Sequence, residues 1–99
     1  MNVSPVEFTV FVDDNFHYQD EDERYRLGVY PTYEAALEAC RTLVDQDLAN
    51  FFKPGMTAAA LIAQYTRFGE DPWITPTPEG TDRFSAWNYA RERAATLCG

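Results

Sequence analysis

Two short segments near the start of the chain alternate between apolar and polar residues, and this alternation constrains the fold more than any other feature. The apolar positions are Phe8, Val10 and Val12 in residues 6–12, and Tyr25, Leu27 and Val29 in residues 24–30. A period of two is typical of strands with one buried face. Because the segments are neighbours in the sequence, we expect them to pair as an antiparallel hairpin, with Gly28 at a bulge or a close contact.

After Pro31 the apolar period becomes helical. Spacings of three and four residues predict three helices, at about 33–50, 57–67 and 86–97. The expected buried stripe of the last helix is Trp87, Ala90, Ala94 and Leu97. Asp45 and Asp47, near the end of the first helix, are interpreted as solvated charges.

The predicted helix ends carry recognisable capping residues. Thr32, Thr57 and Ser85 are suitable N-caps, because their hydroxyls can accept a bond from a free backbone N–H. Phe84 and Tyr89 are spaced for a hydrophobic staple at the start of the last helix. Gly69 is predicted to end the second helix in the left-handed conformation.

These elements predict a small α+β domain in the order β-β-α-α-(β)-α, with three helices packed on a small antiparallel sheet. Residues 73–75 (WIT) are the candidate third strand. Their flanking prolines favour a sheet edge, because proline cannot donate a ladder hydrogen bond. At 99 residues, the chain is expected to form a single domain over 1–99.

The net charge of −8 is concentrated in the first half of the chain. Residues 1–50 hold 11 acidic and three basic side chains, whereas residues 51–99 hold five of each. A strongly negative surface disfavours nucleic acid and anionic membranes, which both attract basic patches. A basic protein or a cation is the compatible partner.

The expected compartment is the cytoplasm. Residues 1–12 have no basic region followed by an apolar stretch, and no segment approaches the length of a membrane span. Cys40 and Cys98 fall on apolar helix stripes, so we interpret them as buried free thiols. A disulfide between them is the less favoured alternative in a reducing compartment.

Residues 13–24, DDNFHYQDEDER, are the most unusual stretch of the chain. They contain six carboxylates and the only histidine. An EF-hand calcium loop is excluded, because Tyr18 stands where that loop needs glycine and Arg24 where it needs the final carboxylate. A looser cation site at Asp13, Asp14 and Asp20 stays open.

Aromatic anchors among charges are typical of a docking surface. The leading interpretation is therefore a non-enzymatic interaction module that presents this stretch to a basic protein. The candidate binding residues are Asp13, Asp14, Asn15, Phe16, His17, Tyr18, Asp20, Glu21, Asp22 and Glu23. Packing of Phe16 and Tyr18 against the helices is the structural alternative.

Two other functions stay open. One is a small enzyme or divalent-cation-binding protein centred on His17 and Asp13, although neither Ser4 nor Ser85 lies in a recognisable nucleophile motif. The other is a nucleic-acid mimic. No catalytic residue, metal ligand or cofactor is assigned, and the chain is expected to be a monomer or a homodimer, since a hairpin leaves strand edges unpaired.

Four stretches resemble small bacterial proteins with no established activity. They are FTVFVDDNFHYQDEDERYRLG, the PGM before the second helix, FGEDPWI and FSAWNYARER. The resemblance extends from Glu7 to Cys98 and implies a bacterial cytoplasmic protein. It transfers no catalytic or binding role to any residue.

Overall fold

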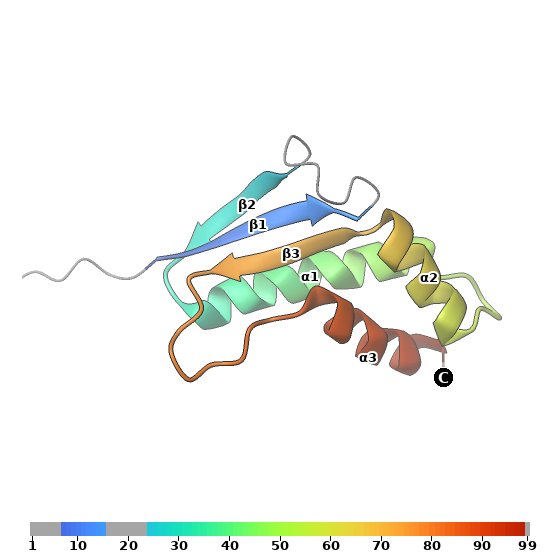
Figure 1. Ribbon diagram of the computed structural model, residues 1–99. Helices are drawn as coiled ribbons and strands as arrows, with labels where there is room; N and C mark the ends of the chain where they lie inside the picture. Colours follow the sequence, from blue (N-terminus) through green and yellow to red (C-terminus); the bar gives the residue numbers. More distant parts are fainter. Residues whose placement is uncertain (1–6, 16–23, 99) are drawn as a thin grey trace, which may run out of the picture.

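The computed structural model describes residues 7–15 and 24–98, which form a three-stranded sheet packed against helices (Figure 1). In chain order the elements are β1 (Phe8–Asp14), β2 (Tyr25–Tyr30), α1 (Tyr33–Phe51), α2 (Ala58–Phe68), β3 (Glu70–Thr75) and α3 (Ala86–Cys98). This confirms the predicted α+β class and the order of its elements, including the third strand.

The first strand of the chain lies in the middle of the sheet. The strand order is β2-β1-β3, and β1 pairs antiparallel with both neighbours. β3 is an edge strand, as predicted, but it begins at Glu70 and is therefore longer than residues 73–75. The edge position tolerates Pro72, which has no N–H to donate.

A bulge interrupts the pairing of β1 with β2. Val10 lies opposite Gly28 but Phe11 lies opposite Arg26, so Leu27 is the extra residue. The prediction that Tyr25, Leu27 and Val29 share one face is therefore wrong, because an extra residue reverses the alternation beyond it. Gly28 combines the bulge with a close contact, since a Cβ there would lie 3.0 Å from the Tyr30 hydroxyl.

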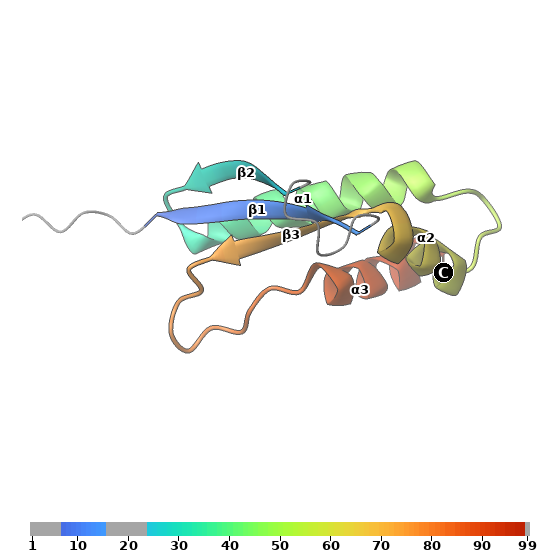
Figure 2. The ribbon, with the colours of Figure 1, turned by 45° about the horizontal axis from the view of Figure 1, so that its top comes forward.

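Helix α1 covers one face of the sheet, and none of the helices formed by residues 7–15 and 24–98 lies across the opposite face (Figures 1 and 2). The core between α1 and the sheet contains Val10, Val12, Ala36, Cys40 and Ile74, which are at most 5% exposed. Removing these side chains from water is the main stabilising contribution of this layer.

A second core lies between the three helices. Its buried residues are Val44, Leu48, Leu61, Tyr65, Ala86, Ala90 and Ala94, and Phe84 packs against both cores. Three alanines at spacings of four residues let α3 approach its neighbours closely. Leu97 is 40% exposed, so its assignment to the buried stripe is wrong.

The predicted N-caps are confirmed. Thr32 Oγ1 accepts from the N–H of Ala35 at 3.0 Å, and Thr57 Oγ1 accepts from that of Ala60 at 3.1 Å. Ser85 Oγ accepts from the N–H of Asn88 at 3.2 Å in the same way. Each hydroxyl satisfies one of the backbone donors that a helix start leaves free.

Gly69 does not adopt the predicted left-handed conformation. Its φ of −79° and ψ of −175° are extended, and the chain passes directly from α2 into β3. Space explains the glycine instead, because a Cβ would lie 2.5 Å from Cδ1 and 2.7 Å from the carbonyl oxygen of Tyr65. Tyr65 is fully buried, so its ring has no room to retreat.

We expect Gly69→Ala to lower the free energy of unfolding by about 1–3 kcal/mol, because the added methyl overfills a closed contact. Urea denaturation measures this loss. Gly28→Ala is the matched control: its Cβ would meet the hydroxyl end of the partly exposed Tyr30 side chain, which has more room to move than the fully buried Tyr65. Equal losses in the two variants would contradict the packing explanation.

Candidate functional site

Three of the ten candidate binding residues lie in the described part of the chain, at the end of β1. These are Asp13, Asp14 and Asn15. The other seven lie outside the described residues: Phe16, His17, Tyr18, Asp20, Glu21, Asp22 and Glu23. The sequence interpretation of those seven therefore stays a prediction.

Asn15 is buried, with 7% of its surface exposed. Its Nδ2 donates to the carbonyl oxygen of Tyr65 at 3.0 Å, and its Oδ1 accepts from Trp87 Nε1 at 3.3 Å. Its backbone N–H donates to the carbonyl oxygen of Gly69 at 3.0 Å. One amide thus joins the end of β1 to α2 and α3.

Carboxylates gather where β1 ends and β3 begins. Asp13 lies opposite Asp71, and Asp14 lies opposite Glu70. We refer to these four residues as the acidic sheet end. Arg24 forms an ion pair with Asp13, with 2.6 Å between Nε and Oδ1.

Helix α1 adds a fifth carboxylate to this region. Asp47 Oδ2 accepts from the backbone N–H of Glu70 at 2.8 Å, and the hydroxyl of Tyr25 donates to Glu70 Oε2 at 2.6 Å. Asp45 accepts from the hydroxyl of Tyr89 and from Arg93. The interpretation as a solvated charge is therefore wrong for Asp47, which burial affects strongly, whereas the side chain of Asp45 is 42% exposed and binds α3 from the surface.

Two of these carboxyls have raised pKa values. Burial, reinforced by the charge of Asp13, raises the pKa of Asp71 from 3.8 to about 6. Burial also raises the pKa of Asp47 from 3.8 to about 6, where the backbone bond from Glu70 opposes the shift and the charges of Glu70 and Asp14 add to it. Both shifts show that the fold resists ionisation here.

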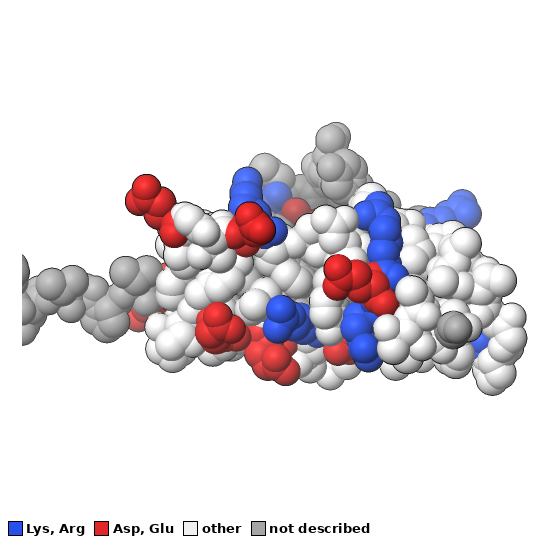
Figure 3. Space-filling model, turned by 90° about the horizontal axis from the view of Figure 1, so that it is seen from below, with Lys and Arg blue, Asp and Glu red and all other residues white. Residues whose placement is uncertain are grey.

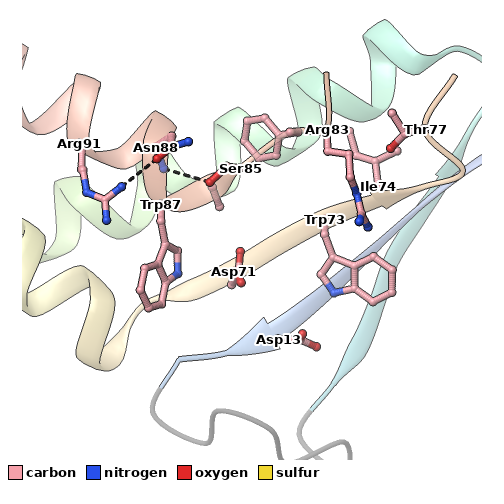
Figure 4. A pocket seen from close by; sticks show the side chains of 12 residues that line it. Asp13, Asp71, Trp73, Ile74, Thr77, Arg83, Ser85, Trp87, Asn88 and Arg91 are labelled. Atoms are coloured by element: carbon pink, nitrogen blue, oxygen red, sulfur yellow. Dashed lines mark hydrogen bonds between the residues drawn. The ribbon is translucent and has the colours of Figure 1, made fainter. Parts of the chain in front are cut away.

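A cavity of about 600 Å³ lies between β3 and α3, beside the acidic sheet end; we call it the β3–α3 cavity. It is lined by Asp13, Asp71, Trp73, Ile74, Thr77, Arg83, Phe84, Ser85, Ala86, Trp87, Asn88 and Arg91. In Figure 4, Asp71 lies between the indole rings of Trp73 and Trp87. These are the only tryptophans of the chain.

Polar groups of this cavity lack partners. Trp73 Nε1 is buried and makes no hydrogen bond. The Asp71 carboxylate is partly buried, and no hydrogen bond or ion pair to it occurs in residues 7–15 and 24–98. A buried donor without an acceptor is costly, whereas a partly buried carboxylate without a partner can still accept a hydrogen bond from a ligand.

Sequence reasoning did not assign a site to Asp71, Trp73 or Trp87. A usable signal was present in the segment EDPWIT, where an acidic residue and a tryptophan stand two positions apart and therefore share a strand face. The contribution of α3 had no such signal, because it depends on how the helix packs.

His17, on which the enzyme and cation hypotheses are centred, lies outside the described residues. Within 7–15 and 24–98, no group of three or more His, Cys, Asp or Glu side chains is placed to hold a metal ion. Burial raises the pKa of Cys40 to about 12, which keeps this thiol protonated at neutral pH. Over the same residues, no helix is long and apolar enough to cross a membrane.

Comparison of the chain with protein-family models, with curated proteins and with solved structures gave no match. The geometry of the acidic sheet end and of the β3–α3 cavity is therefore the basis for a functional proposal.

We expect Asn15→Leu to lower the free energy of unfolding by about 1–3 kcal/mol, because it removes a buried bond and leaves Trp87 Nε1 without an acceptor. Urea denaturation followed by tryptophan fluorescence measures the loss. Asn50→Leu, at an exposed position on α1, is the control. A loss no larger than that of the control would contradict the role of Asn15.

The raised pKa values of Asp47 and Asp71 predict that the free energy of unfolding decreases as the pH rises from about 4 to about 6. In this range the unfolded chain releases protons that folded Asp47 and Asp71 retain, so each rise in pH favours unfolding. Asp71→Asn should make the free energy of unfolding depend less on pH and should increase it at pH 7. Urea denaturation at a series of pH values measures both effects. Exposed Glu38→Gln is the control, and an unchanged pH dependence in Asp71→Asn would contradict the assignment.

Proposed function

We propose that this protein is a non-enzymatic interaction module that binds a basic protein. The proposed surface is the acidic sheet end together with the segment 16–23, which continues from β1 and carries Asp20, Glu21, Asp22 and Glu23. The observation that carries the proposal is the placement of two acidic residue pairs directly opposite each other on β1 and β3.

Such pairing has a cost for folding. Like charges directly opposite each other on neighbouring strands destabilise a sheet. Arg24 offsets part of this cost at Asp13, and the hydroxyl of Tyr25 donates to Glu70, which lies opposite Asp14. A chain that keeps this concentration of negative charge has a surface suited to attracting positive charge.

One face of the molecule carries charges of both signs. Figure 3 views the molecule from below and shows acidic and basic side chains interleaved over that face. That face therefore offers mixed charge to a basic partner, whereas carboxylates lie opposite each other at the acidic sheet end and would attract positive charge.

Replacing Asp20, Glu21, Asp22 and Glu23 by Ser should abolish capture of basic proteins from a bacterial lysate, because it removes four charges from the proposed surface. Bound proteins are identified by mass spectrometry across a salt series. Wild-type capture should weaken as salt rises, since salt screens exposed charges.

The control removes the same number of charges elsewhere. A variant with Glu34, Glu38, Glu79 and Glu92 changed to Gln alters four exposed carboxylates outside the sheet end. It should retain the wild-type partners. The proposal fails if both variants lose the same proteins, or if no captured protein is basic and salt-sensitive.

A further inference from the structure

The β3–α3 cavity combines three properties that together describe one kind of ligand. It is large enough for a side chain, it contains two indole rings, and its Asp71 carboxylate has no ion-pair partner among the described residues. Indole faces attract cations, and a partly buried carboxylate favours a charged hydrogen-bond donor. Both features select a positively charged group that can also stack.

One arginine of the chain already binds a carboxylate and an indole ring in the way proposed for the ligand. Arg24 pairs with Asp13 at 2.6 Å, and its Cζ lies 5.2 Å from the centre of the Trp73 ring. An arginine thus already contacts both a carboxylate and an indole on β1 and β3. Asp71 lies opposite Asp13, with Trp87 on its other side, and it repeats the carboxylate-and-indole arrangement with no arginine of the chain bound there.

We propose that the β3–α3 cavity accepts an arginine side chain of the basic partner, with the guanidinium paired to Asp71 and stacked on the ring of Trp87. The ring of Trp73 lines the same cavity but already contacts Arg24 and Phe11. Arginine fits better than lysine because its planar group can stack on indole while it donates two bonds to one carboxylate. This inference rests on the proposed function and names the chemical group that the site would recognise.

Trp73 Nε1 does not take part in this recognition, because it is buried and has no surface open to a ligand. The Asp71 carboxylate is only partly buried and can receive the guanidinium.

Arg83 and Arg91 also line the cavity and oppose a second cation. Both are exposed, and Arg91 donates to Asn88 Oδ1 at 2.8 Å. Their positive charges weaken the attraction of the cavity for a guanidinium group, but neither arginine forms an ion pair with Asp71. Removal of the Arg83 charge should consequently strengthen binding, a result that a purely structural cavity would not produce.

The test is a titration of the full chain with acetyl-arginine-amide, followed by NMR of the two indole N–H groups. Both signals should shift, because both tryptophans line the cavity. Acetyl-citrulline-amide, which has nearly the same shape without the charge, should cause no comparable shift. Equal responses to the two probes would overturn the proposal, and an equal response to acetyl-lysine-amide would overturn the choice of arginine.

Three variants locate the interaction. Asp71→Asn should weaken binding of acetyl-arginine-amide by about tenfold or more, as expected for loss of a charged hydrogen bond. Because this variant is predicted to gain stability at pH 7, unfolding does not explain such a loss. Glu38→Gln should bind as wild type, and Arg83→Gln should bind more tightly.

Other outcomes would overturn the proposal. Unchanged binding by Asp71→Asn would place the probe elsewhere. Indole shifts caused by inorganic phosphate and lost in Arg83→Gln would assign the cavity to an anion. If lysate capture depends on Asp20 to Glu23 but not on Asp71, this inference fails and the proposed function stands. If arginine binds through Asp71 but capture ignores Asp20 to Glu23, the proposed function fails instead.

Discussion

The hydrogen bonds of the Asn15 side-chain amide fix how α2 and α3 are placed relative to the end of β1. The amide binds the last turn of α2 through Tyr65 and the first turn of α3 through Trp87, from a position immediately after β1. Apolar packing holds helices to a sheet without a strong preference for direction. A buried amide with two defined partners supplies that direction, and it brings Trp87 to the edge of β3 where the cavity forms.

The acidic sheet end and the β3–α3 cavity share Asp13 and Asp71, so the charge and the cavity belong to one surface. Long-range attraction and short-range recognition can then act on the same partner in succession. The surface charge would raise the rate of encounter, and a cavity with unpartnered polar groups would select among the molecules that arrive. The proposed function and the further inference describe these two stages.

Local patterns were enough to predict the elements of this fold. Caps such as Thr32 and Thr57 act on their own helix, so their effect can be read from neighbouring residues. The incorrect predictions concern residues whose conformation depends on other elements. Gly69 and Leu27 depend on contacts between elements, one through the buried ring of Tyr65 and the other through a bulge. The cavity could not be predicted for the same reason, because its walls come from β3 and α3.

Residues 16–23 lie between Asn15, whose side chain binds α2 and α3, and Arg24, which forms an ion pair with Asp13 of β1. The sheet register is therefore set outside residues 16–23. A segment whose two ends are held in this way can change in length at small entropic cost. If the proposed function holds, substitutions in residues 16–23 would change the choice of partner and leave the framework of described residues as it is.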